Sequence, residues 1–286
     1  MKKLIHLSDL HICPMGERIV GFDPAARLRA VVASINRDHP DAHACILSGD
    51  LTDRGDKDSY VRLRDLTRHL KPPTYYMLGN HDRRQPFLEI FEGVTVDENG
   101  FVQSIVDLGN TRLILLDSLD ERVPSAGRLC PHRMAWLERV LGESTDRRVI
   151  VFIHHPPVSI RVECFEYMLL ANGGELDALL RRYPVVQHVA FGHVHLPVFG
   201  RVGPYSISSA RGTCHPIQVT LNGLTVTYVE RAPSYELILV DGDTVLVHHV
   251  QLAAESEIVA TELADDVGGP GEIKVLRQSR GDYDGH

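Results

Sequence analysis

The stretch Ala42-His43-Ala44-Cys45-Ile46-Leu47-Ser48-Gly49-Asp50 decides the fold of this chain. Its apolar run is typical of a buried central strand, and the glycine ends that strand abruptly. We therefore expect Asp50 at the carboxyl end of the strand, which is the edge of an open α/β sheet where ligands bind. A single aspartate after glycine is usually a turn or N-cap residue. Asp50, however, has counterparts at the ends of other strands.

The segments on either side of this stretch repeat a strand-then-helix pattern. Residues 3–8 predict a first strand, and the helix after it begins at Asp23-Pro24, which fits an N-cap followed by an N1 proline. A second helix follows Asp50, and residues 74–78 predict a third strand. Repeated units of this kind predict an α/β fold with parallel strands.

The later part of the chain continues the alternation with less regularity. The expected elements are hairpin strands over 101–107 and 111–118, a helix over 131–141, a strand over 148–153, a helix over 175–183 and a strand over 185–191. Residues 158–172 have no clear period and are expected to form a lid-like excursion. Short β-like runs follow residue 195, and the chain after residue 253 is expected to be weakly structured.

Composition excludes several classes of protein. A chain of 286 residues buries a core without disulfides, and its five cysteines form no CxxC pair, so the sequence predicts a reducing compartment, the cytoplasm. No segment has the length of a membrane span or the core of a signal peptide, and we expect no membrane partner. The net charge of -8, without a basic stripe, argues against a nucleic-acid polymer as partner.

Polar side chains follow five of the predicted strands. They are Asp9 and His11, Asp50, Asn80 and His81, His154 and His155, and His193 and His195. Each has an ordinary structural explanation by itself, since buried histidines are usually hydrogen-bonded and an asparagine after glycine usually forms a turn. The same placement at five strand ends favours one shared site.

The ligand chemistry of this set favours divalent metal ions. Carboxylate, imidazole and amide oxygen without thiolate suit Mn, Fe, Co, Ni or Zn. A bridging Asp50 allows seven side chains to form two sites, whereas a single ion leaves several buried polar groups without a partner. Two such ions, two carboxylates and a bridging hydroxide leave a net charge of about +1, which suits an anionic phosphorus ester attacked by that hydroxide.

Five blocks of the chain match, in order, the signature blocks of the calcineurin-like metallophosphoesterases: Asp9-x-His11, Gly49-Asp50, Gly79-Asn80-His81-Asp82, His154-His155-Pro156 and Gly192-His193-x-His195. These blocks span about two-thirds of the sequence. Within the superfamily the chain resembles the bacterial class III cyclic nucleotide phosphodiesterases and glycerophosphodiesterases. Weaker signals for that branch are the loop over 14–23 and Gly212-Thr213-Cys214-His215.

The resemblance implies a division of the ligands between two metal ions, with Mn and Fe favoured. One ion would take Asp9, His11, Asp50 and His195, and the other would take Asp50, Asn80, His154 and His193. His81 would act as general acid for the leaving alkoxide or stabilise charge, with Asp82 orienting its ring.

The resemblance also implies contacts with substrate. Asn80, His81 and His195 are expected to touch it, and Phe22, Arg211 and His215 are candidate residues of the substrate pocket. For His155 a structural role and a functional role remain open. Asp53 is expected to cap the next helix or to support Asp50 rather than to bind metal.

The implied fold is an αββα sandwich of two mixed β-sheets with a C-terminal β-rich extension. Residues 1–200 would form the metallophosphoesterase core, 201–252 would supply the last core strands and a dimerisation hairpin, and 253–286 would be an acidic tail. A homodimer or higher homo-oligomer is expected by analogy with the family alone.

The sequence therefore predicts a binuclear metal-dependent phosphodiesterase for small anionic phosphodiesters, either cyclic nucleotides or glycerophosphodiesters. A phosphomonoesterase on the same site is the first alternative, because the ligand set does not distinguish a monoester from a diester. A non-catalytic protein-binding scaffold is the remote alternative, since the chain retains every ligand position.

Overall fold

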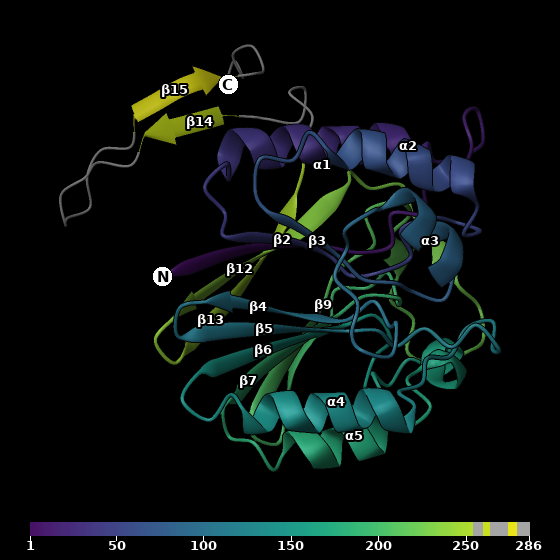
Figure 1. Cartoon of the computed structure of the whole chain (residues 1–286). Coiled ribbons are helices and arrows are strands. Elements are labelled where there is room, and N and C mark those ends of the chain that lie inside the picture. The colour runs from purple at the N-terminus through teal and green to yellow at the C-terminus, as the bar shows by residue number, and fades with distance from the viewer. Residues whose placement is uncertain (254–259, 264–273, 279–286) are drawn as a thin grey trace.

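The computed structural model describes residues 1–253, 260–263 and 274–278 (Figure 1). Two β-sheets lie face to face, and helices cover the outer face of each sheet. This confirms the predicted αββα sandwich of two mixed sheets.

The first sheet has the strand order β13-β12-β1-β2-β3. Its strands are β1 (Lys2–Leu7), β2 (Ala44–Leu47), β3 (Thr74–Tyr76), β12 (Ser234–Asp241) and β13 (Thr244–Gln251). The first three are parallel, and β12 pairs antiparallel with β1. Helices α1 (Pro24–Asp38), α2 (Lys57–Thr67) and α3 (Arg84–Ile90) pack on its outer face.

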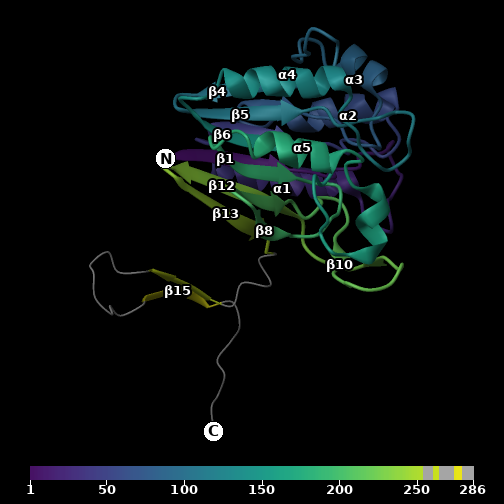
Figure 2. The same ribbon diagram turned by 90° about the horizontal axis from the view of Figure 1, so that it is seen from below.

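The second sheet has the order β4-β5-β6-β7-β9-β8. Its strands are β4 (Ser104–Leu108), β5 (Thr111–Leu116), β6 (Arg148–Ile153), β7 (Val186–Phe191), β8 (Phe199–Val202) and β9 (Tyr205–Ser209). Helices α4 (Pro131–Gly142) and α5 (Gly173–Leu180) cover its outer face, and Figure 2 shows this side of the molecule. Strands β5, β6, β7 and β9 are parallel, so their following loops gather at one edge.

Apolar side chains fill three layers, which fixes the two sheets against each other. One layer lies between the sheets and includes Leu4, Ile46, Ile150 and Phe152, all with no exposed surface. The other two layers lie between each sheet and its own helices. Because β2 and most of β6 are buried on both faces, their sequences are continuous apolar runs, as in a central parallel strand.

Most predicted elements are present, with a few differences. Asp23 caps α1 by accepting the Ala26 N–H. Helix α3 was not predicted, because its N-cap residue Arg83 makes no capping side-chain bond and gives no signal in the sequence. Within 158–172 the chain forms a 3-10 helix, η1 (Glu163–Met168).

Two short strands form a separate antiparallel pair after the second sheet. They are β10 (Ile217–Gln218) and β11 (Thr227–Tyr228). In Figure 2 this pair stands at the edge of the body near η1, to which it is tied by a bond from the Glu163 N–H to the Leu221 carbonyl.

The predicted weakly structured tail falls largely outside the described residues. Within it, β14 (Ala260–Leu263) and β15 (Lys274–Gln278) pair antiparallel. No helix in the described part of the chain is long and apolar enough to cross a membrane.

Candidate metal centre

Five of the predicted ligands adopt left-handed backbone conformations. Their φ angles are 55° for Asp9, 46° for His11, 45° for Asp50, 71° for His193 and 52° for His195. Residues other than glycine seldom adopt this region, and each such position costs about 1–3 kcal/mol. Every one lies in the loop that follows β1, β2 or β7. Strain is therefore concentrated at the positions that the sequence predicts as ligands.

Four of the ligands form a first group. The ligand atoms of Asp9, His11, Asp50 and His195 all lie within 4.8 Å of one another, and all four residues are buried. His11 Nε2 is 3.2 Å from His195 Nε2 and 3.8 Å from Asp50 Oδ2. His195 Nε2 is in turn 3.5 Å from Asp9 Oδ1. Strands β1, β2 and β7 thus bring their following loops to one point.

A second group lies on the other side of Asp50. Asp50 Oδ1 is 3.3 Å from His154 Nε2, and ligand atoms of His154, His155 and His193 lie within 4.8 Å of one another. Asn80 is buried beside them, since its neighbour Gly79 faces both Asp50 and His154. The Asn80 amide nitrogen donates to the Pro124 carbonyl (3.2 Å), which leaves Oδ1 free.

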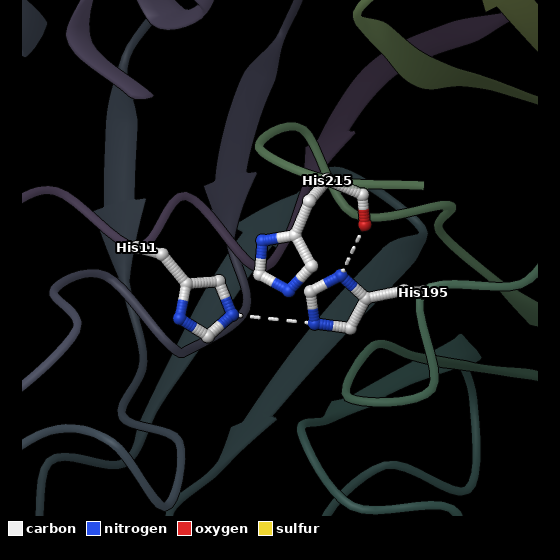
Figure 3. Close-up of side chains that lie close together, drawn as sticks. All are labelled: His11, His195 and His215. Atoms are coloured by element: carbon white, nitrogen blue, oxygen red, sulfur yellow. Dashed lines mark hydrogen bonds between the residues drawn. The ribbon is translucent and has the colours of Figure 1, made fainter. Parts of the chain in front are cut away.

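Backbone carbonyls orient the histidine rings. Nδ1 of His154 lies 3.0 Å from the Ser48 carbonyl, and Nδ1 of His195 lies 2.8 Å from the His215 carbonyl (Figure 3). A carbonyl only accepts, so Nδ1 carries the proton in both rings and donates it. Nε2 then keeps its lone pair, which is the arrangement of metal-binding histidines.

Burial and charge set the protonation of the group. Burial lowers the pKa of His193 to about 3, and burial also lowers the pKa of His195 despite the nearby Asp9 carboxylate. Both imidazoles are therefore neutral near pH 7. For His154, burial is outweighed by the Asp50 carboxylate, which raises the pKa to about 9. The Asp50 pKa stays well below its usual value in spite of burial, chiefly because of His154. These carboxylates favour a cation beside them.

The residues fit a pair of divalent ions. Within the described part of the chain, both ring nitrogens of His193, Nε2 of His154 and Oδ1 of Asn80 are buried without a hydrogen-bond partner. Leaving such atoms unsatisfied is costly, and they are uncommon in folded proteins. All are ligand atoms for divalent ions, and Asp50 faces both groups.

His81 lies at the rim of the centre. Its side chain is 40% exposed, whereas those of the predicted ligand histidines are almost fully buried. Its ring packs edge-on against His11 at 4.7 Å, and its backbone N–H donates to Asp50 Oδ1 (2.9 Å). This placement suits a residue that contacts a bound substrate.

The prediction that Asp82 orients His81 is wrong. Asp82 is fully buried and accepts bonds from the N–H groups of Leu51, Thr52 and Gly79 and from the Tyr60 hydroxyl. Burial, followed by the nearby Asp50 charge, raises the pKa of Asp82. The tight loops after β2 and β3 leave backbone donors that need this carboxylate, so it is turned away from the imidazole.

Asp53 lies beside both His81 and His11 instead. Its carbonyl lies 2.8 Å from His81 Nδ1, and its Oδ1 lies 3.5 Å from His11 Nδ1. The expected capping role belongs to Asp56, which accepts the Ser59 N–H at the start of α2. The only sequence signal for Asp53 is its position three residues after Asp50.

The structure places the candidate pocket residues in different surroundings. His215 stacks on His195 with ring centroids 4.2 Å apart and lies 4.7 Å from His11 (Figure 3). Phe22 is half-buried in the loop before α1, where it packs against the Arg27 guanidinium at 4.9 Å.

Two other residues have structural partners. Arg211 donates to Gln251 Oε1 on β13 (3.0 Å). Within the part of the chain that the structure describes, this side-chain hydrogen bond joins Arg211 to the first sheet rather than to the metal centre. His155 Nδ1 bonds the Ser118 hydroxyl (2.8 Å), while its ring lies 4.8 Å from that of His193. Ser118 had no signal in the sequence.

Comparison with known proteins places this geometry in a family. The model of the calcineurin-like phosphoesterase family matches residues 2–197. The chain is 36% identical over 253 residues to a probable cyclic nucleotide phosphodiesterase of Rhodopseudomonas palustris, covering 86% of this chain and 91% of that protein. It is 30% identical over 238 residues to a probable glycerophosphodiester phosphodiesterase of Arcobacter nitrofigilis, covering 82% and 87%.

A solved structure supports the same fold. The dimetal phosphatase of Danio rerio superposes with a TM-score of 0.62 at 15% identity, covering 88% of this chain and 99% of that one. At this identity the likeness concerns the fold alone. The family match and the two relatives, at 36% and 30% identity, show that the chain belongs to the calcineurin-like phosphoesterase family.

Proposed function

We propose that the chain is a binuclear metal-dependent phosphodiesterase that hydrolyses small diesters, with cyclic nucleotides and glycerophosphodiesters as the substrate classes. The similar proteins of R. palustris and A. nitrofigilis carry these two activities in their names. The observation that carries the proposal is the position of Asp50, 3.8 Å from His11 Nε2 and 3.3 Å from His154 Nε2.

The residues divide into two proposed ligand sets, with Asp50 shared. Asp9, His11 and His195 complete one set, and Asn80, His154 and His193 complete the other. A pair of divalent ions, for which we propose Mn or Fe, would supply Lewis acidity and a water of lowered pKa. The buried ligands hold their positions before any substrate binds, because carbonyls and left-handed backbone fix them.

His81 is the proposed proton donor to the leaving alkoxide. Its Nδ1 proton is held by the Asp53 carbonyl, so Nε2 is the atom that carries the transferable proton in the imidazolium form. Asp53 Oδ1 lies 3.9 Å from the same Nδ1. His81 and Asn80 lie beside Asp50, so a phosphodiester bound at the centre would contact both.

The same reasoning gives the proposed setting. All five cysteines are free, which supports the cytoplasm as the compartment. The net charge of -8 supports a small anionic substrate drawn by the metal pair rather than a nucleic-acid polymer. A homodimer or higher homo-oligomer is proposed by analogy with the family.

Initial rates on an aryl phosphodiester and the matching monoester test the proposal. The protein is loaded with Mn²⁺, and bis(p-nitrophenyl) phosphate and p-nitrophenyl phosphate are compared at equal concentration. A clear preference for the diester is expected. A preference for the monoester would identify a phosphatase, and inactivity on both, with two bound ions, would favour a scaffold.

A further inference from the structure

We propose that Tyr228 is a specificity residue whose ring stacks on the nucleobase of a substrate, so that the site prefers nucleotide diesters to diesters of glycerol. This inference rests on the proposed function and chooses between its two substrate classes. It concerns a residue outside the signature blocks, on the short strand β11.

A single side chain, His215, lies between the Tyr228 ring and the proposed ligands His195 and His11. His215 stacks on His195 with centroids 4.2 Å apart and an interplanar angle of 26°, and it also lies 4.7 Å from His11 (Figure 3). The Tyr228 ring lies 5.4 Å from the same His215 ring at 63°. The His215 ring therefore packs against two proposed ligands of one ion and also against Tyr228.

Backbone bonds hold Tyr228 at this distance. It pairs with Ile217 in the β10–β11 register, and the next residue, Val229, donates to the Pro216 carbonyl (3.1 Å). Ile217 in turn donates to the carbonyl of His195 (3.5 Å). The short strand pair is thus attached directly to a proposed metal ligand, which fixes the ring relative to the reacting phosphate.

The Tyr228 ring remains available to a ligand. It is 44% exposed, whereas Tyr60, Tyr205 and Tyr235 are almost fully buried in the core. The connection between β10 and β11 also exposes apolar side chains, namely Val219, Leu221, Leu224 and Val226. Large apolar groups left exposed on the segment that carries Tyr228 favour an ester substituent with an apolar or aromatic face.

A nucleobase meets this requirement and glycerol does not. With the phosphate held at the metals, a nucleoside places its base about one sugar away, which is the scale of the single imidazole between the ligands and Tyr228. A base stacked on an aromatic side chain gains roughly 1–3 kcal/mol, the equivalent of about 5- to 150-fold in affinity. Glycerol has no π face and little apolar area, so it gains nothing comparable.

Kinetics of Tyr228 variants on two diesters test the inference. The experiment compares four Mn²⁺-loaded proteins: wild type, Y228A, Y228F and the control T227A. The control changes the exposed neighbour of Tyr228 on the same strand. We expect Y228A to raise KM for cyclic AMP about tenfold and to leave KM for glycerophosphoglycerol within about twofold. Y228F, which keeps the ring, and T227A are expected to match wild type on both. Melting temperatures of all four proteins establish that they are folded.

Calorimetry supplies a second readout that needs no turnover. Binding of 5′-AMP to the metal-loaded protein should weaken about tenfold in Y228A, while binding of glycerol 3-phosphate should stay unchanged. Equal losses on both ligands, no loss on either, or a loss in Y228F as large as in Y228A would each overturn the inference. Inactivity of wild type on both diesters would refute the proposed function instead, and the calorimetric comparison would still decide the role of Tyr228.

Discussion

Oδ1 of Asp50 lies 3.3 Å from Nε2 of His154, although Asp50 follows β2 of the first sheet and His154 follows β6 of the second. The contact joins two elements 104 residues apart in the chain. Oδ2 of the same carboxylate faces His11 at 3.8 Å. A single side chain thus stands between two groups of proposed ligands, and the packing of the two sheets determines the separation of these groups.

Replacement of Asp50 by asparagine should remove the proposed shared ligand with little change in shape. The neutral amide binds divalent ions poorly, so we expect fewer than two ions per chain and a fall in kcat/KM of about 10²- to 10³-fold or more. Elemental analysis and diester hydrolysis measure both effects. Asp243→Asn, at a side chain 93% exposed, is the control and should match wild type. Two bound ions and full activity in Asp50→Asn would contradict the shared site.

Asp82 is expected to matter for folding stability more than for orienting His81. Its carboxylate accepts from three backbone N–H groups and one hydroxyl in a fully buried position. Asp82→Ala leaves these donors unsatisfied and should lower the free energy of unfolding by about 3 kcal/mol. Urea denaturation measures this. Asp65→Ala, on the exposed face of α2, should change it by less than about 0.5 kcal/mol. Unchanged stability with a selective loss of proton donation would return Asp82 to the orienting role.

The sequence predicted the strands well and indicated side chains that the structure brings together, because both depend on local pattern. Apolar runs ended by glycine mark where Asp50, Asn80 and His193 emerge. The orientation of side chains in the loops depends on tertiary packing and was harder to predict. Both Asp82 and Asp53 were available to His81, and the unsatisfied N–H groups of two turns decided between them.

Arg211 illustrates the same limit. It precedes the Gly212-Thr213-Cys214-His215 segment, which made it a candidate pocket residue, and Gly212 does lie against His195 and Asp9. Its side chain instead meets Gln251, since β13 is the edge strand of the first sheet and approaches this loop. Long-range pairing of that kind leaves no mark in a local pattern.

His188 should make the stability of the metal-free protein depend on pH. It is buried between Ser206 and Ser208, with both ring nitrogens 2.8 Å from a serine hydroxyl, and burial lowers its pKa to about 4. In the unfolded protein the His188 imidazole has a pKa near 6.5, whereas in the folded protein its pKa is about 4. Between these two pH values the unfolded state therefore binds more protons than the folded state. Stability should therefore fall as the pH drops from 6.5 to 4, by up to about 3 kcal/mol.

Urea denaturation at several pH values compares wild type with two variants. His188→Asn should be less stable at pH 7 but show a shallower decline toward pH 4, because the group that titrates is gone. His248→Asn, at an exposed residue of β13, should keep the wild-type slope. Parallel curves for wild type and His188→Asn would contradict the assignment.

Gly79 should be the glycine whose replacement by alanine damages the metal centre. A Cβ atom there would meet Oδ1 and the backbone nitrogen of Asp50 and would lie 2.6 Å from Nε2 of His154. Oδ1 of Asp50 and Nε2 of His154 face each other across the centre. The added methyl group must therefore displace at least one of these two side chains. Gly79→Ala is expected to lose one or both ions and to slow diester hydrolysis about 100-fold or more. Its circular dichroism spectrum should match that of wild type, because the fold is retained.

Gly142→Ala is the matched control, because it adds the same methyl group at the end of α4 where nothing lies within 4 Å. It should keep two ions and full activity and gain about 0.5–1 kcal/mol of stability, since alanine favours the helix more than glycine does. If Gly79→Ala bound two ions and retained wild-type rates, the loop after β3 would have to yield without moving Asp50 or His154. The close approach of that loop would then not be what holds the shared carboxylate between the two groups of ligands.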